Sequence, residues 1–140
     1  MEAIDRHLAL SWESFFRVFT QVKGNCTQVT SDQFVELLQS FQSVVTTFEH
    51  GPTQTQIANM LSALGAKIAK LAVQLVHNEP HSLLCCRAGM DLFICAQHCQ
   101  LQAARIYGDQ GHHKEQDEAY FALLGSIGSA QVAALKLART

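Results

Sequence analysis

Apolar residues recur every three or four positions through most of this 140-residue chain, and this spacing constrains the fold more than any other feature. Such spacing places apolar side chains on one face of an α-helix, whereas a half-buried strand alternates apolar and polar residues. Alternation of that kind does not persist for more than a few residues anywhere in the sequence. The pattern therefore predicts an all-α protein.

Five helical segments are expected, joined by short connections. The third is the best delimited, because Thr53 and Gln56 form a capping-box pattern before it and Pro80 follows it. Gly51 and Gly108 are expected to end the second and fourth segments. Because short loops make neighbouring helices antiparallel, residues 1–140 are predicted to form a single domain, an up-down antiparallel bundle of four to five helices. The expected segments are Ala3–Lys23, Thr30 to about Phe48, Thr53–Asn78, His81–Tyr107 and Lys114–Leu137.

The last two segments are the most apolar. The stretch Leu83–Ala96 is apolar nearly all round, which predicts a helix covered on most of its sides and therefore placed at the centre of the bundle. In the fifth segment, the large apolar residues are expected to face inward. They are Tyr120, Phe121, Leu124, Ile127, Val132 and Leu135.

Charge is scarce in this sequence and argues against several function classes. Charged residues make up 16% of the chain and the net charge is −2, against roughly 25% charged residues in an average soluble domain. The ten basic residues are scattered, which disfavours binding to nucleic acids or to an anionic membrane surface. The uncharged stretch Ala119–Leu135 is short for a membrane span and contains glycine and serine, so we expect a buried or interfacial soluble helix and no membrane span.

Two uncharged surfaces are the candidate partner-binding sites. The polar side of the second segment carries amides and hydroxyls without charge, and the fifth segment carries a ridge of small residues that lets another helix approach closely. The partner helix of this ridge can belong to the same chain or to another one. The candidate residues are Gln39, Gln42, Ser43 and Thr46 in the second segment, and Gly125, Ser126, Ser129 and Ala133 in the fifth.

A metal site is the first alternative. Cys95 and Cys99 are four residues apart, so their thiols share one face of a helix, with His98 beside them. Thiolates at this spacing suit Cu(I) or part of a zinc site. The segment resembles the cysteine-lined four-helix copper-storage proteins, in which thiols converge from several helices; here the other helices supply none. Packing of these cysteines in the core is the favoured interpretation, and no cofactor is expected.

No catalytic constellation is recognisable, so we do not expect an enzyme. Asp91 stands inside the apolar run without a second group for acid–base chemistry. The sequence favours a non-enzymatic protein-interaction module, a small subunit or adaptor of an intracellular assembly that is able to self-associate. A carrier of an apolar ligand, suggested by the many phenylalanines, is a second alternative. Because an odd number of cysteines sits largely in one helix, we expect the reducing cytoplasm as the location.

Overall fold

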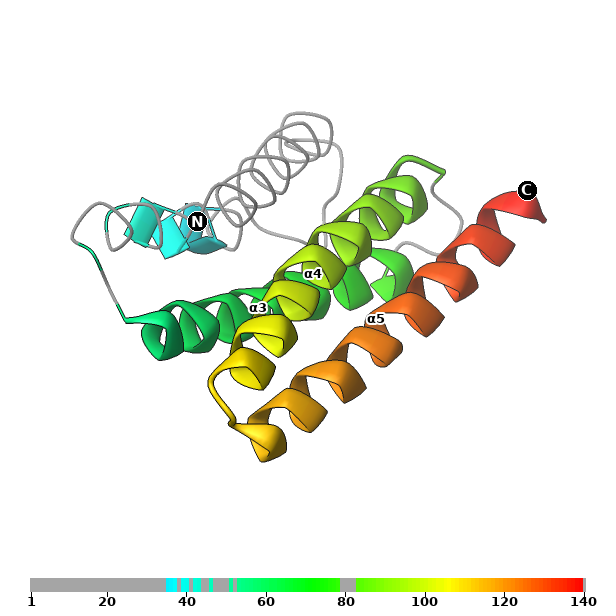
Figure 1. The fold of residues 1–140 in the computed structure, drawn as a ribbon. Coiled ribbons are helices and arrows are strands. Elements are labelled where there is room, and N and C mark those ends of the chain that lie inside the picture. Colours follow the sequence, from blue (N-terminus) through cyan, green and yellow to red (C-terminus); the bar gives the residue numbers. More distant parts are fainter. Residues whose placement is uncertain are drawn as a thin grey trace.

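In the part of the chain that it describes, the computed structural model has three long helices, preceded by further helical residues (Figure 1). The long helices are α3 (Gln54–Asn78), α4 (Leu83–Asp109) and α5 (His113–Ala138). The described part of the chain holds no strand, which confirms the all-α class for it. The expected first helix lies outside the described residues, and the number of helices stays a prediction. The structure describes residues 35–37, 39–40, 42–43, 46, 51, 53–78 and 83–139.

The start of α3 is set by a reciprocal pair of hydrogen bonds, as the sequence predicts. The backbone N–H of Gln56 donates to Thr53 Oγ1 at 3.2 Å, and the backbone N–H of Thr53 donates to Gln56 Oε1 at 2.9 Å. Both N–H groups would otherwise lack an acceptor within the helix. Gly51 precedes them with a φ angle of +64°, the left-handed conformation expected of a residue that ends a helix.

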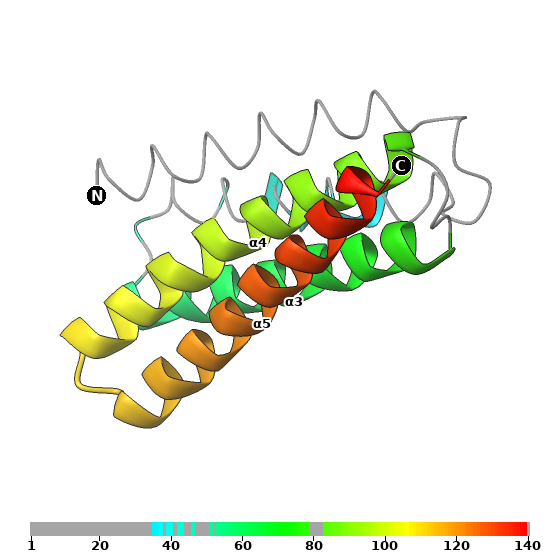
Figure 2. The ribbon, with the colours of Figure 1, turned by 90° about the vertical axis from the view of Figure 1, so that its right-hand side faces the viewer.

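Helix α4 ends two residues later than predicted, at Asp109 instead of Tyr107, and α5 begins one residue earlier, at His113. Gly108 does not stop α4, which continues past it, and Gly111 reverses the chain with a φ angle of +78°. The backbone N–H of Gly111 donates to the Gly108 carbonyl at 3.1 Å, and that of His112 donates to the Tyr107 carbonyl at 2.8 Å. These bonds close the last turn of α4, and α5 then runs back alongside it (Figures 1 and 2).

Helix α4 occupies the centre of the described bundle. It packs along both α3 and α5, whereas α3 and α5 meet at few positions. This arrangement confirms the central position predicted from the apolar stretch Leu83–Ala96. More than half of the α4 residues are buried, among them Leu92, Phe93, Cys95, Ala96 and Cys99.

Two glycines allow α3 and α4 to approach closely. A Cβ atom added at Gly89 of α4 would lie 2.5 Å from Val76 Cγ2 and 3.2 Å from the Ala72 carbonyl oxygen, both in α3. A Cβ atom at Gly65 of α3 would lie 2.9 Å from Gln100 Cγ of α4. Ordinary van der Waals contact needs more space than this, so both positions depend on the missing side chain.

Candidate interaction surface

The inner face of α5 packs on α4 with small side chains. Ala119, Ser126 and Ala133 are the buried residues of α5, and Ala130 packs against the same core. They recur at helical spacing along one stripe, so the backbone of α5 lies close to α4. Part of the small-residue ridge therefore packs within the chain, because Ser126 is 3% exposed and Ala133 is 0% exposed.

A buried polar contact fixes the position of Ser126. In the amide orientation that gives both ends complementary partners, Gln100 Nε2 lies 2.8 Å from Ser126 Oγ and 3.3 Å from the carbonyl oxygens of Ala96 and Ala122. Gln97 Nε2 also donates to the Ser126 carbonyl at 3.4 Å. Buried polar groups favour a fixed geometry because leaving them unsatisfied is costly. Two glutamines of α4 therefore hold the middle of α5.

The large side chains of α5 point away from the bundle. Phe121 is 75% exposed, Leu124 63% and Leu135 55%. The expectation that these residues face inward is wrong, and it is also wrong for Tyr120, Ile127 and Val132, which are exposed as well. The physical reason is that α5 has small residues on one side and large ones on the other, and close packing on α4 selects the small side.

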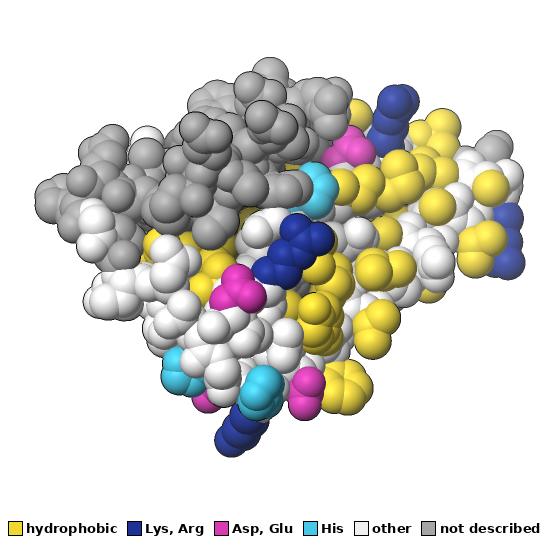
Figure 3. All heavy atoms as spheres, in the orientation of Figure 1, with side chains coloured by type: hydrophobic (Ala, Val, Ile, Leu, Met, Phe, Trp, Pro, Cys, Tyr) yellow, Lys and Arg dark blue, Asp and Glu magenta, His cyan; other side chains and the backbone are white. Residues whose placement is uncertain are grey.

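We call the exposed stripe of α5 the outer α5 face. Its residues follow one another at intervals of three or four, which places them on one side of the helix. Figure 3 shows hydrophobic side chains gathered along this helix on the visible surface. The outer α5 face consists of Phe121, Leu124, Gly128, Val132 and Leu135.

An apolar groove of about 510 Å³ borders the outer α5 face. The wall formed by α3 consists of Val73, Val76 and His77. Phe93 of α4 also lines the groove. We call it the α3–α5 groove. Its α5 wall contains two of the predicted site residues, Gly125 and Ser129, together with Leu124, Gly128 and Val132.

Helix α5 also has the length and composition of a membrane-crossing helix. Only 11% of its most apolar 18-residue window is buried, whereas the core helix of a soluble protein is mostly buried. No charged residue interrupts the stretch from Ala119 to Leu135. Sequence hydropathy therefore does not distinguish a protein-binding surface from a lipid-facing one.

The four predicted site residues of the second segment, Gln39, Gln42, Ser43 and Thr46, are all exposed. Helical residues of the same segment contact α3 through Leu37, which is buried, and through Ser40, whose Oγ accepts from Lys67 Nζ at 3.4 Å. The amide side therefore stays open to solvent while Leu37 joins the core.

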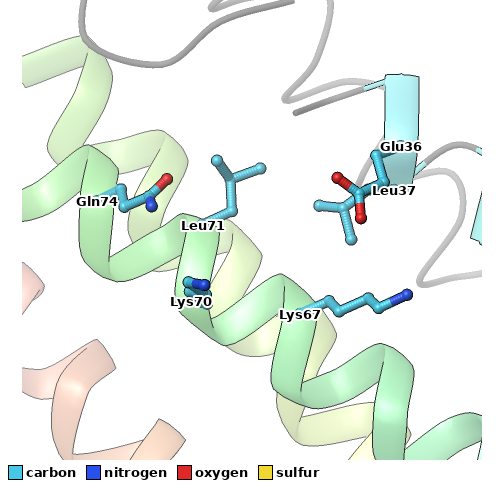
Figure 4. Close-up of a pocket in the computed structure, with 6 residues that line it drawn as sticks. All are labelled: Glu36, Leu37, Lys67, Lys70, Leu71 and Gln74. Atoms are coloured by element: carbon cyan, nitrogen blue, oxygen red, sulfur yellow. The ribbon is translucent and has the colours of Figure 1, made fainter. Parts of the chain in front are cut away.

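A hollow of about 260 Å³ lies between this segment and α3 (Figure 4). Glu36 and Leu37 face the side chains of α3 across it. It combines one carboxylate with two lysines and apolar walls, and no motif from the sequence coincides with it. The α3 side is formed by Lys67, Lys70, Leu71 and Gln74.

The four cysteines of α4 are buried. Cys95 and Cys99 are 0% and 2% exposed and carry thiols, as does the buried Cys86, whereas Cys85 is disulfide-bonded. Among the described residues, no group of three or more His, Cys, Asp or Glu side chains could hold a metal ion. Nothing there adds a ligand to the Cys95–Cys99 pair, and Asp91 is half-buried on the same helix.

A polar corner closes the end of the bundle at the α4–α5 turn. The Tyr107 hydroxyl donates to Asn59 Oδ1 of α3, and its ring meets the His112 ring edge-on at 6.4 Å between centroids. Burial, with a further contribution from the negative charges of Glu115 and Glu118, raises the pKa of Tyr107 above its usual value of 10.0. This corner therefore links α3 and α4 to the start of α5.

Comparison of the chain with protein-family models, with curated proteins and with solved structures found no match. The function is therefore inferred from the chain's own surfaces. The outer α5 face was missed from the sequence because large apolar residues were assigned to the core. The periodic separation of small from large residues along α5 was the available signal.

Proposed function

We propose that this protein is a non-enzymatic interaction module, a small subunit or adaptor that binds another protein through the outer α5 face and the adjoining α3–α5 groove. The observation that carries the proposal is the exposure of several large apolar side chains on one face of one helix. Soluble proteins rarely expose contiguous apolar patches of this kind unless another molecule covers them.

The composition of the surface agrees with a protein partner. Fully buried parts of protein interfaces are depleted in Lys, Glu and Asp and enriched in aromatic side chains. The outer α5 face has no charged member and contains Phe121, its most exposed large side chain. Aromatic anchors that enter a partner's pocket often dominate the binding energy, and Phe121 is the candidate for that role.

A second contact surface is proposed on the amide side of the second segment. Gln39 and Gln42 are exposed there, and amide groups are less costly to bury in an interface than charged groups. The variant Gln42→Lys tests this surface, because it adds a charge at an exposed position. We expect it to weaken binding of a partner that covers the segment and to leave stability unchanged.

Capture experiments with matched variants test the proposal. The tagged 140-residue chain is expressed in its native cells as wild type, as Leu124→Lys and as Ala134→Lys. Both positions are exposed on α5, but only Leu124 belongs to the outer α5 face. We expect proteins that co-purify with the wild type and with Ala134→Lys to be lost with Leu124→Lys. The same proteins captured by all three would contradict the proposal.

Flotation with lipid vesicles separates protein binding from membrane binding. The purified wild type is mixed with phosphatidylcholine–phosphatidylglycerol vesicles and centrifuged on a density gradient. The interaction-module proposal expects the protein to remain below the lipid fraction. Flotation of the wild type, lost with Leu124→Lys, would assign the outer α5 face to the membrane instead.

An intracellular, reducing location is retained as part of the proposal, and the cysteines provide its test. The chain has five cysteines, and a reducing compartment keeps them as thiols. The disulfide at Cys85 is at odds with this expectation. Rapid alkylation in living cells, followed by mass spectrometry, counts the thiols. Five alkylated cysteines support the cytoplasm, and three or fewer contradict it.

A further inference from the structure

We propose that the outer α5 face binds the same face of a second copy of this chain, with the two α5 helices antiparallel and a two-fold axis at Gly128. The inference rests on the proposed function and names the partner of that surface. A two-fold interface requires a self-complementary patch, in which each residue meets its counterpart across the axis.

The sequence of the outer α5 face is approximately symmetric about Gly128. Residues at equal distances on either side have matching character, with an aliphatic pair four residues away and a large apolar pair seven residues away. At eleven residues on either side stand two exposed residues of opposite charge. The pairs are Leu124 with Val132, Phe121 with Leu135, and Asp117 with Arg139. Because four, seven and eleven are all helical repeats, the pairs share one face of α5.

Charge complementarity selects the antiparallel orientation. Asp117 and Arg139 are both exposed, near opposite ends of the helix. In an antiparallel pair, each Asp117 lies beside the Arg139 of the other copy, so both ends gain an attraction. A parallel pair would instead place the two Asp117 carboxylates together and the two Arg139 side chains together. Complementary charges at the edge of an interface fix its register more than its strength.

The glycines of α5 lack the internal reason that explains those of α3 and α4. A Cβ atom at Gly65 or Gly89 would clash with the neighbouring helix, whereas one at Gly125 or Gly128 would have nothing within 4 Å. Glycine in a helix interior costs roughly 1 kcal/mol relative to alanine, so two open glycines in one helix need another explanation. Close approach of a second helix at Gly128 supplies it.

The α3–α5 groove offers room beside the axis for side chains of the second helix. Gly128 lines the α3–α5 groove together with Leu124 and Val132, and the opposite wall carries the exposed Val73 of α3. A second α5 laid across Gly128 would bring its own Leu124 and Val132 to this groove. The uncharged stretch and the groove would then be covered together.

Sedimentation velocity of the purified 140-residue chain tests the self-association. The wild type is expected to be a dimer in the micromolar range. Gly128→Phe places two bulky rings on the axis and is expected to weaken the dimer roughly 30-fold or more. A Cβ atom at Gly128 would have nothing within 4 Å in the monomer, so we expect circular dichroism to show unchanged helicity. Ala134→Phe introduces the same side chain at an exposed position outside the face and should leave dimerisation unchanged.

A charge exchange tests the antiparallel register. Asp117→Arg and Arg139→Asp should each weaken the dimer about 3- to 10-fold at low salt, because each places like charges together across the interface. The double variant restores opposite charges and should return to within about twofold of the wild type. A double variant as weak as the single ones would overturn the proposed register.

The outcomes separate this inference from the proposed function. A wild type that stays monomeric up to about 0.1 mM overturns the self-association. If proteins are then still captured in a Leu124-dependent way, the interaction-module proposal stands with a different partner. Vesicle flotation of a monomeric wild type overturns both.

Discussion

Helices α4 and α5 are alike in length and in their long uncharged stretches, yet α4 is buried on most sides and α5 on only one. Helix α4 lies between two neighbours, α3 and α5, and buries large residues such as Leu92 and Phe93. Among the described helices, α5 has one principal neighbour, α4, which it meets with alanine and serine, and it exposes Phe121 and Leu124. Apolar composition indicates that a helix needs cover, but the distribution of side-chain sizes decides which side the fold itself covers.

The largest difference between the two helices should appear when a leucine is truncated in each. Leu92→Ala removes a fully buried side chain and should lower the free energy of unfolding by about 2–5 kcal/mol. Leu124→Ala removes an exposed one and should change it by less than about 0.5 kcal/mol. Urea denaturation at high dilution measures both. An equal loss for Leu124→Ala would show that the outer α5 face is covered within the monomer.

The helical glycines should respond with opposite signs. Gly89→Ala forces a Cβ atom against Val76 and Ala72 and should destabilise the fold by about 1–3 kcal/mol. Gly125→Ala meets open space and should stabilise the monomer by about 0.5–1 kcal/mol through helix propensity. Thermal unfolding of the two variants checks this. Destabilisation by Gly125→Ala would mean that α5 packs more closely on its surroundings than its exposure indicates.

The three long helices differ in how much of their structure the sequence alone predicts. The start of α3 was predictable because Thr53 and Gln56 satisfy each other's backbone N–H groups through purely local contacts. The central position of α4 was predictable because its stretch Leu83–Ala96 is apolar nearly all round. The orientation of α5 was not, since both of its sides are uncharged and only the shape of α4 decides between them.

The same limit applies to the candidate sites. Gly125 and Ser129 were predicted as partner-binding residues and do line the α3–α5 groove, whereas Ser126 and Ala133 of the same ridge lie against α4. The two groups lie on adjacent sides of the helix and consist of residues of similar size. Residue size alone therefore could not distinguish the groove-lining residues from the buried ones. The groove itself needs Val73 and His77, which are distant in sequence and enter only through the packing of α3 beside α5.

The seam between α4 and α5 should contribute less to the free energy of unfolding than the burial of Leu92 does, and its contribution depends on hydrogen bonding. Ser126→Ala removes the hydroxyl beside Gln100 Nε2 and should lower the free energy of unfolding by about 1–2 kcal/mol, because a buried amide loses a partner. Ser129→Ala is the matched control on the groove side, where the effect should stay below about 0.5 kcal/mol. Similar losses at both positions would contradict the assignment of Ser126 alone to the buried contact.

At the end of this seam, charges of α5 act on a buried group of α4, and pH should reveal it. Burial, then Glu115 and Glu118, raise the pKa of Tyr107 above 10.0, so the unfolded chain loses this proton first. The stabilisation by the neutral phenol is complete below about pH 10 and falls as pH rises through the folded pKa. Tyr107→Phe removes that dependence along with the hydrogen bond to Asn59, at a cost of about 0.5–1.5 kcal/mol near neutral pH.

Denaturation of the wild type and Tyr107→Phe between about pH 8 and 11 measures this difference, since other titrating groups are common to both chains. The free energies of unfolding should converge as pH rises above 10, because only the wild type loses the contribution of Tyr107. A constant gap across this range would mean that Tyr107 titrates alike in the folded and unfolded chains. Glu118→Gln should reduce the pH dependence that Tyr107 gives to the free energy of unfolding, without abolishing it. Burial is the larger cause of the raised pKa of Tyr107, and the Glu118 carboxylate only adds to it.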